Sequence, residues 1–114
     1  MHILKEVIGR DALNDLIGDY FDDMIKGVVD VERELLAVNA ELHADLEAML
    51  LEDGSKKEDL WGINLYPEMD DIDDFLEFDS LINIRPRQGN RSRGVEDEKT
   101  REKIRNVVEK WVRE

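Results

Sequence analysis

Apolar and polar positions along the chain switch between a strand period of two and a helix period near 3.6. Residues 2–8 are mostly apolar and end at Gly9, which predicts a short first strand. After Asp11, a residue suited to capping a helix, apolar side chains recur at i, i+3 and i+4 as far as Met24. The sequence therefore predicts a strand and then an amphipathic helix over residues 11–24.

The middle of the chain returns to the strand pattern and then to the helix pattern. Two apolar segments within residues 25–40, rich in valine, flank the polar Glu32-Arg33-Glu34, which favours a β-hairpin over a single helix. Residues 41–53 show helical spacing, and Gly54 supplies a usual stop. Apolar stripes lie on two sides of this helix, so we expect it to be covered on both sides.

The last third of the chain predicts two strands and a helix. Alternation over residues 60–67 indicates one strand, and alternation over residues 75–85 indicates a second. One face of the second strand is polar and carries Glu77, Asp79, Asn83 and Arg85. The acidic connection between the strands makes them an antiparallel pair, and residues 96–112 form a clearly amphipathic last helix.

The resulting order is β-α-β-β-α-β-β-α, with three helices and about five short strands. This mixture predicts an α+β fold with a mostly antiparallel sheet, covered mainly on one face by helices. No repeat or long linker divides the chain, and its 114 residues suit one hydrophobic core. We therefore expect a single domain over residues 1–114.

Composition restricts the classes of function. With no cysteine and no apolar run long enough to span a bilayer, we expect a cytoplasmic protein without disulfides, a cofactor or a membrane segment. A net charge of −13 opposes binding to nucleic acids and membrane surfaces. The charge is uneven, because residues 1–84 hold 6 Lys/Arg against 23 Asp/Glu, whereas residues 85–114 hold 10 against 6. A local positive patch is therefore expected near Arg85.

The change of sign falls on an arginine-rich loop just before the last helix. Arginine forks suit phosphate and carboxylate groups, glycine lets the backbone approach a ligand, and a helix N-terminus adds positive potential. The predicted ligand-binding residues are Asn83, Arg85, Gly89, Asn90, Arg91, Ser92, Arg93 and Gly94. The loop lacks the Gly-Lys-Ser/Thr signature of a P-loop. Its arginines also have many carboxylates with which to pair internally, and this alternative stays open.

A second candidate site lies on the helix predicted over residues 41–53. His43 and Glu47 are one turn apart, in a polar notch between the two apolar stripes. Such residues can act as an acid/base pair, and they can ligate a metal if a further ligand is supplied. The alternative is a satisfied helical ion pair or hydrogen bond. The acidic run over residues 70–74 does not match an EF-hand loop, so we expect no metal site there.

Three segments carry a distinctive combination of residues. They are Glu41-Leu42-His43-Ala44-Asp45-Leu46-Glu47, then Gly54-Ser55-Lys56-Lys57-Glu58-Asp59-Leu60-Trp61-Gly62-Ile63-Asn64, and Glu77-Phe78-Asp79-Ser80-Leu81-Ile82-Asn83-Ile84-Arg85-Pro86 running on to Gly89-Asn90-Arg91-Ser92-Arg93-Gly94-Val95-Glu96-Asp97. Together they resemble a family of small uncharacterised archaeal and bacterial proteins, a domain of unknown function. The resemblance covers most of the chain and implies no activity or catalytic residue. Arg87 departs from the small polar residue expected before Gln88, so it is left out of the predicted site.

Three hypotheses about function follow from these patterns. The leading one is a module that binds a small anion or a phosphorylated ligand with the loop at residues 85–94. A hydrolase acting on a phosphorylated substrate is less favoured, because it requires His43 and Glu47 to converge on the arginines. The competing hypothesis is an interaction or structural protein. Its acidic surface would engage a basic protein partner, and its arginine loop would brace the last helix.

Overall fold

Within residues 1–113, which the computed structural model describes, five strands form one sheet whose hydrogen-bonded neighbours all run antiparallel. In spatial order the strands are β1 (His2–Ile3), β4 (Leu35–Val38), β3 (Ile25–Asp30), β5 (Leu60–Leu65) and β6 (Leu76–Glu77). Two further short strands, β2 (Ile8–Gly9) and β7 (Val112–Arg113), pair in parallel with each other. The prediction of an α+β fold with a mostly antiparallel sheet is confirmed.

The hairpin predicted for residues 25–40 is formed by β3 and β4. Asp30 organises its turn, because Oδ1 of Asp30 accepts hydrogen bonds from the backbone N–H groups of Glu32 (2.9 Å) and Arg33 (2.8 Å). Glu34 then adopts a φ of 55°, in the left-handed region. The aspartate side chain therefore holds the turn by hydrogen bonds, and Glu34 takes the left-handed conformation that tight hairpins usually give to glycine or asparagine.

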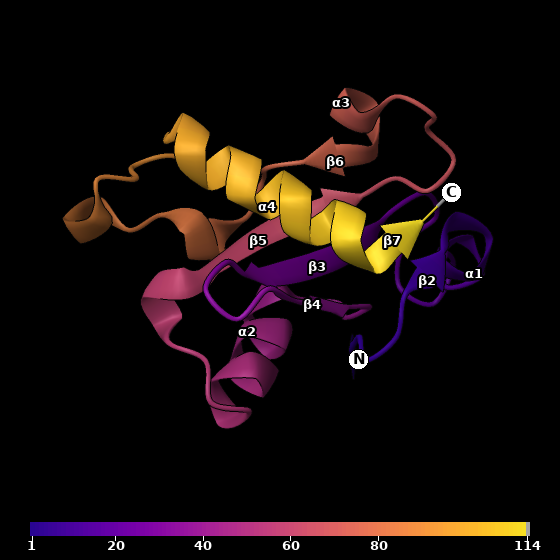
Figure 1. Cartoon of the computed structure of the whole chain (residues 1–114), viewed down its shortest axis with the longest axis horizontal. Helices are drawn as coiled ribbons and strands as arrows, with labels where there is room; N and C mark the ends of the chain where they lie inside the picture. The colour runs from indigo at the N-terminus through magenta and orange to yellow at the C-terminus, as the bar shows by residue number, and fades with distance from the viewer. Residues whose placement is uncertain (114) are drawn as a thin grey trace.

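Helices pack on both faces of the sheet (Figure 1). On one face α4 (Glu98–Trp111) contributes Ile104, Val107 and Val108 to a large apolar cluster. On the other face α2 (His43–Glu52) buries Leu46 and Leu50 against a smaller cluster. The expectation that helices would cover mainly one face is wrong, because β3, β4 and β5 are buried along nearly their whole length on both faces.

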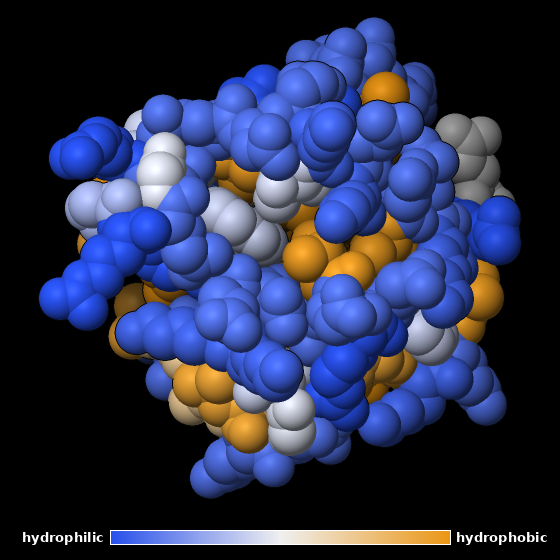
Figure 2. Space-filling view, turned by 60° about the vertical axis from the view of Figure 1, so that its left-hand side comes forward, coloured by the Kyte–Doolittle hydropathy of each residue, from blue (hydrophilic) through white to orange (hydrophobic). Residues whose placement is uncertain are grey.

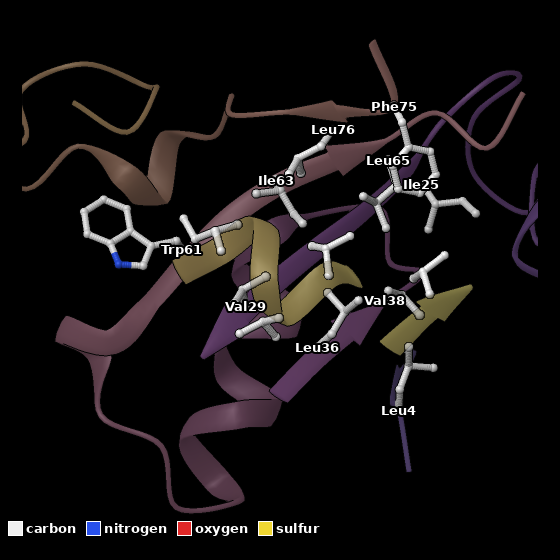
Figure 3. Packing of buried hydrophobic residues seen from close by; sticks show 14 of the residues in the cluster. Leu4, Ile25, Val29, Leu36, Val38, Trp61, Ile63, Leu65, Phe75 and Leu76 are labelled. Carbon is white, nitrogen blue, oxygen red and sulfur yellow. The ribbon is translucent and has the colours of Figure 1, made fainter. Parts of the chain in front are cut away.

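The larger cluster lies between the sheet and α4. Figure 3 shows it as a continuous layer with Trp61 at one end and Phe75 at the other. Trp61 and Ile63 of β5 belong to this layer. Because neighbouring residues of a strand point to opposite faces, Gly62 and Asn64 face the side that α2 covers. That second face carries the candidate site described below.

The first predicted helix is much shorter than its apolar pattern indicated. The helix α1 (Arg10–Asn14) ends early, and the chain continues in turns and bends until β3. Gly18 has a φ of 100°, a conformation that a right-handed helix cannot continue through. Leu13 is nevertheless fully buried, and Leu16 and Ile17 pack against the larger cluster. The spacing therefore predicted burial correctly and helix length wrongly.

Two predicted strands also differ from the structure, so the element order does too. The segment 2–8 is divided into β1 and β2 by exposed residues 5–7. The segment 75–85 is a strand only in β6, after which the chain leaves the sheet and forms 3-10 turns at Leu81–Asn83 and Pro86–Gln88. The connection before β6 contains the short helix α3 (Ile72–Phe75), which was not predicted and which brings the α-helices of the described residues to four.

The sides of the helices that point away from the sheet are exposed. In α2 the second apolar stripe, consisting of Ala44, Ala48 and Leu51, is exposed, so the expectation of cover on both sides is wrong. The sheet lies against only one side of this helix, and that contact buries Leu46 and Leu50 of the other stripe. None of the helices in residues 1–113 has the length and apolar character that crossing a lipid bilayer requires.

Candidate functional site

The arginine-rich loop is held in one shape from within by Asn90. Nδ2 of Asn90 donates to the carbonyls of Asn83 (2.8 Å), Ser92 (3.1 Å) and Gly94 (2.8 Å). Oδ1 of Asn90 accepts the N–H of Glu96 (2.8 Å). The Asn90 side chain is buried, and its single amide group provides a hydrogen-bond partner for four backbone groups of the loop. Asn90 was predicted as a ligand contact, and the structure uses it to order the loop.

Carboxylates of the protein occupy the backbone donors that a bound anion would use. The N–H groups of Arg91 (2.6 Å) and Ser92 (2.9 Å) both donate to Oε2 of Glu96. Asp97 caps α4 by accepting the N–H of Thr100 (3.0 Å). The two N–H groups hold the pKa of Glu96 below its ordinary value, because they stabilise the charged form. An anion that entered this loop would have to displace Glu96.

This arrangement predicts how the stability of the loop depends on pH. The pKa of Glu96 is lower in the folded state than its ordinary value of 4.5. Its contribution to stability is therefore fully present above that value and is lost as the pH falls through the folded pKa. We expect Glu96→Gln to lower the free energy of unfolding near pH 7, and the difference from wild type to shrink as the pH falls through the folded pKa of Glu96. Urea denaturation at several pH values measures this.

The matched control is Glu102→Gln, which removes an exposed carboxylate from α4. Its difference from wild type should change with pH less than that of Glu96→Gln. A Glu96→Gln difference that is constant across the pH range would contradict the assigned role of the two N–H groups.

The structure places the loop arginines in different surroundings. Nε of Arg93 lies 2.7 Å from Oδ1 of Asp79, in an ion pair at the surface. The guanidinium of Arg85 stacks 4.1 Å from the centre of the Trp61 ring and donates to the carbonyl of Lys57. The side chain of Arg91 is exposed. Two of the three predicted arginine donors, Arg85 and Arg93, therefore already make contacts within the protein.

Asn83 closes the part of the β5 edge that β6 leaves open. Its Oδ1 accepts the N–H of Gly62 (2.8 Å), and its Nδ2 donates to the carbonyl of Gly62 (3.0 Å). Nδ2 also donates to the carbonyl of Arg93 (2.9 Å). The side-chain amide thus takes the place of a neighbouring strand, because it offers one donor and one acceptor to the same residue. This pairing satisfies the backbone of Gly62 where the chain after Glu77 no longer runs as a strand.

A pocket of about 550 Å³ lies beside the N-terminal end of α2. It opens over a row of three polar residues on adjacent strands, since Lys26 of β3 pairs with Asn64 of β5, and Asn64 pairs with Glu77 of β6. The first residues of α2 line one side, and residues 79–82 line the other. Arg93 also lines this pocket and is the member of the predicted loop site that reaches it.

Asn64 is the centre of the polar contacts in the pocket. It is 5% exposed, and its Nδ2 donates to Oε1 of Glu77 (2.8 Å) and to the carbonyl of Asp79 (3.2 Å). The hydroxyl of Tyr66 donates to the same Oε1 (3.0 Å). Burial and the Glu77 carboxylate raise the pKa of Tyr66 to about 12, so the hydroxyl remains a donor at neutral pH. Within the described residues, Oδ1 of Asn64 is buried without a hydrogen-bond partner.

His43 enters the pocket from α2 with its ring held in place. Its Nε2 lies 2.8 Å from the carbonyl oxygen of Ile63. A carbonyl only accepts hydrogen bonds, so Nε2 carries the proton and Nδ1 of the neutral ring is an acceptor. Burial lowers the pKa of His43 below its ordinary value of 6.5, and the contacts with Ile63 and Asn64 only partly oppose this. The ring is therefore uncharged at neutral pH.

The two members of the predicted His43 and Glu47 pair have separate surroundings. His43 lines the pocket together with Arg93. Glu47 lies close enough to Arg85 for its charge to raise the pKa of that guanidinium, which burial lowers. Within residues 1–113, no group of three His, Asp or Glu side chains is arranged as metal ligands would be. His43 therefore shares a pocket with Arg93, whereas Glu47 lies near Arg85.

Sequence reasoning did not single out the residues that lie over the centre of the pocket. Lys26, Asn64, Tyr66 and Glu77 were not predicted as site residues, although they line it with His43. A partial signal was present, because the alternation of residues 60–67 placed Asn64 and Tyr66 on one face, and Glu77 fell on the polar face of the next segment. The missing information was the register that aligns these positions with Lys26.

Comparison with known proteins identifies the family of the chain. A family model described as "Protein of unknown function (DUF5674)" matches residues 2–111. Neither the comparison with curated proteins nor the comparison with solved structures finds a similar chain. The resemblance to a domain of unknown function, predicted from the sequence, is confirmed. The chain that carries this pocket and this arginine-rich loop therefore belongs to the DUF5674 family.

Proposed function

We propose that the protein binds a small ligand with an acidic group, a carboxylate or a phosphate, in the pocket between α2 and residues 79–82. The observation that carries this proposal is that two basic side chains, Lys26 and Arg93, line the same pocket from distant parts of the sequence. The proposal keeps the anion-binding hypothesis for Arg93. It moves the ligand from the interior of the loop to the adjacent pocket.

The remaining hydrogen-bond donors of Arg93 support this placement. Only Nε of Arg93 is used in the ion pair with Asp79, so its two terminal nitrogens remain as donors in a planar fork. The side chain is 56% exposed, which leaves it accessible to a ligand. Lys26 is held near the pocket by Phe21, whose ring centre lies 5.1 Å from Nζ of the lysine.

The start of α2 adds further positive potential. Leu42, the residue before the helix, has no side chain that caps it, and within the described residues the helix has no side-chain cap. His43 and Ala44 belong to the first turn and line the pocket. The N–H groups of a first helical turn point out of the helix end and favour negative charge. We propose binding rather than hydrolysis, because Glu47, the predicted partner of His43, lies beside Arg85 instead.

Three single variants, two in the pocket and one outside it, test the position of the site. We first screen phosphate, sugar phosphates and small carboxylates for thermal stabilisation of the wild type. For a ligand found in this way, we expect Arg93→Met and Lys26→Met to weaken binding about tenfold or more, because each removes a charge-assisted contact. Titration calorimetry measures the affinities. Arg91→Met removes an exposed loop arginine outside the pocket and should bind as the wild type does.

The outcomes separate three possibilities for the site. A loss in Arg91→Met equal to that in Arg93→Met would place the ligand inside the loop and contradict the pocket. Unchanged affinity in both Lys26→Met and Arg93→Met would contradict it as well. If no compound in the screen stabilises the wild type, the proposal of an acidic ligand falls.

The alternative function, an interaction or structural module, is supported by the internal contacts of the loop. Glu96 and Asp97 hold the loop against the start of α4, and Arg93 is paired with Asp79. Figure 2 brings forward the side on which the loop lies in Figure 1 and shows a mostly hydrophilic surface with a few apolar patches. In this alternative, Arg93→Met lowers the ligand-free stability, and no small anion raises the melting temperature.

A further inference from the structure

We propose that the ligand of this pocket is a zwitterion with an apolar part, such as an amino acid, whose ammonium group binds at Glu77 while its acidic group faces the basic side chains. This inference rests on the proposed function and specifies the class of ligand. It follows from three properties of the pocket, namely a carboxylate without an ion-pair partner, a further hydrogen-bond acceptor on His43 and an exposed apolar rim.

Glu77 is the carboxylate of the pocket that remains unneutralised. The other pocket carboxylate, Asp79, is paired with Arg93 at 2.7 Å. Between Met1 and Arg113, no Lys or Arg forms an ion pair with Glu77. Asn64 and Tyr66 both donate to Oε1 of Glu77, so they fix the carboxylate in position and leave Oε2 for a ligand. A negative charge fixed in this way favours a cationic group on the ligand.

A further acceptor belongs to His43, which lines the same pocket. Nδ1 of His43 is an acceptor because Nε2 carries the ring proton towards the carbonyl of Ile63. Oδ1 of Asn64 is buried beneath the surface of the pocket, so it is not counted as a ligand contact. An ammonium group carries three N–H donors and can therefore bond both Oε2 of Glu77 and Nδ1 of His43.

The rim of the pocket is apolar and exposed. Leu42 and Leu81 line it and are 54% and 68% exposed, and Met24 lines it too. Binding sites for small molecules usually combine apolar walls with a few placed polar groups. A ligand that bears a hydrocarbon group would cover these side chains and gain free energy by removing them from water. The acidic group, the amine and the hydrocarbon group thus each have a matching surface.

Matched compounds test this inference. L-leucine carries all three groups, 4-methylpentanoate lacks the amine, and 3-methylbutylamine lacks the acid. We expect titration calorimetry near neutral pH to show that L-leucine binds at least about tenfold more tightly than either, since each partial compound loses a charge-assisted contact. The comparison of 6-aminohexanoate with hexanoate and pentylamine repeats the test with the amine further from the acid. Tighter binding of either zwitterion than of its matched acid and amine supports the inference.

The variant Glu77→Gln assigns the amine contact. It keeps an oxygen that can accept from Asn64 and Tyr66 but removes the charge. We expect it to reduce the affinity of the bound zwitterion to that of its matched acid. The affinity of the acid should not fall, because the variant removes a negative charge from the pocket. Glu68→Gln, which changes an exposed carboxylate outside the pocket, should leave both affinities unchanged.

The possible failures are distinguishable. If the acids bind as tightly as the zwitterions, the inference is overturned and the proposed function stands. If Glu77→Gln weakens acid and zwitterion equally, the inference is also overturned, because Glu77 then acts through the shape of the pocket. If the amines bind as tightly as the zwitterions, or if no compound binds while the screen also finds no acidic ligand, the proposed function fails together with the inference.

Discussion

Replacing Asn83 by leucine is expected to lower the free energy of unfolding by about 3–5 kcal/mol, since each buried backbone group left without its partner costs about 1–3 kcal/mol. Asn83 is fully buried and bonds the N–H and C=O of Gly62, which would both lose their partner. It also bonds the C=O of Arg93, which would keep the N–H of Ser80. Leucine has a similar volume and can bond none of them. Urea denaturation followed by circular dichroism measures the change.

The control for this variant is Asn106→Leu. Asn106 is exposed on α4, so its replacement should change the free energy of unfolding by no more than about 0.5 kcal/mol. A similar small loss in Asn83→Leu would show that the amide of Asn83 does not support the edge of β5. Because the same amide also holds the carbonyl of Arg93, a marked loss of stability should be accompanied by weaker ligand binding.

A second large effect is expected when a single methyl group is added at Gly62. A Cβ atom at this position would lie 2.5 Å from both Cβ and Oγ of Ser80 and 3.1 Å from Cγ1 of Ile82. Distances this short force the surrounding backbone to move, so Gly62→Ala should cost about 1–3 kcal/mol of stability. Thermal and urea denaturation of the variant measure this loss.

Removing the obstructing side chain should restore part of the lost stability. Ser80→Gly deletes the two nearest atoms, and on its own it removes a weak cap at 3.3 Å to the N–H of Ile82. We expect the double variant to be more stable than the sum of the single effects indicates, by about 1 kcal/mol or more, as for residues in direct contact. Additive losses would mean that the close approach of Gly62 to Ser80 is not what excludes a side chain.

Secondary-structure elements that are determined by residues close together in the sequence could be predicted. The hairpin over residues 25–40 follows from valine-rich segments around a polar turn, and α2 and α4 follow from helical spacing with a stop or cap nearby. The helix over residues 11–24 was predicted too long because its apolar spacing is also satisfied by a chain of turns that buries Leu13. Periodicity reports which side chains are buried, and it does not report that the helix ends at Asn14, before Gly18 takes a left-handed φ.

The candidate site depends on pairing that no local pattern specifies. The residues Lys26, Asn64 and Glu77 lie far apart in the sequence and become neighbours only through the register of β3, β5 and β6. A shift of that register by one residue would turn Asn64 towards α4 and leave the pocket without its central amide. Single-sequence reasoning therefore predicted polar faces without predicting that they would meet.

For the arginine-rich loop, the sequence predicted the right donors but not the group that binds them. Its composition predicted donors for an anion, and the structure contains such donors at the N–H groups of Arg91 and Ser92. What composition did not specify is that Glu96, a few residues further along the chain, would fill them. A carboxylate this close in sequence reaches the same donors at a lower entropic cost than a free ligand does.

The parallel pairing of β2 with β7 joins residues from opposite ends of the described chain. Ile8 pairs with Val112, and Gly9 pairs with Arg113. Closing a contact across nearly the whole sequence costs more chain entropy than closing the β3–β4 hairpin, so we expect this pair to form late in folding. With only two residues in each strand, we also expect it to be among the first contacts to open in the native state. Its opening should leave the five-stranded sheet intact, because neither β2 nor β7 belongs to that sheet.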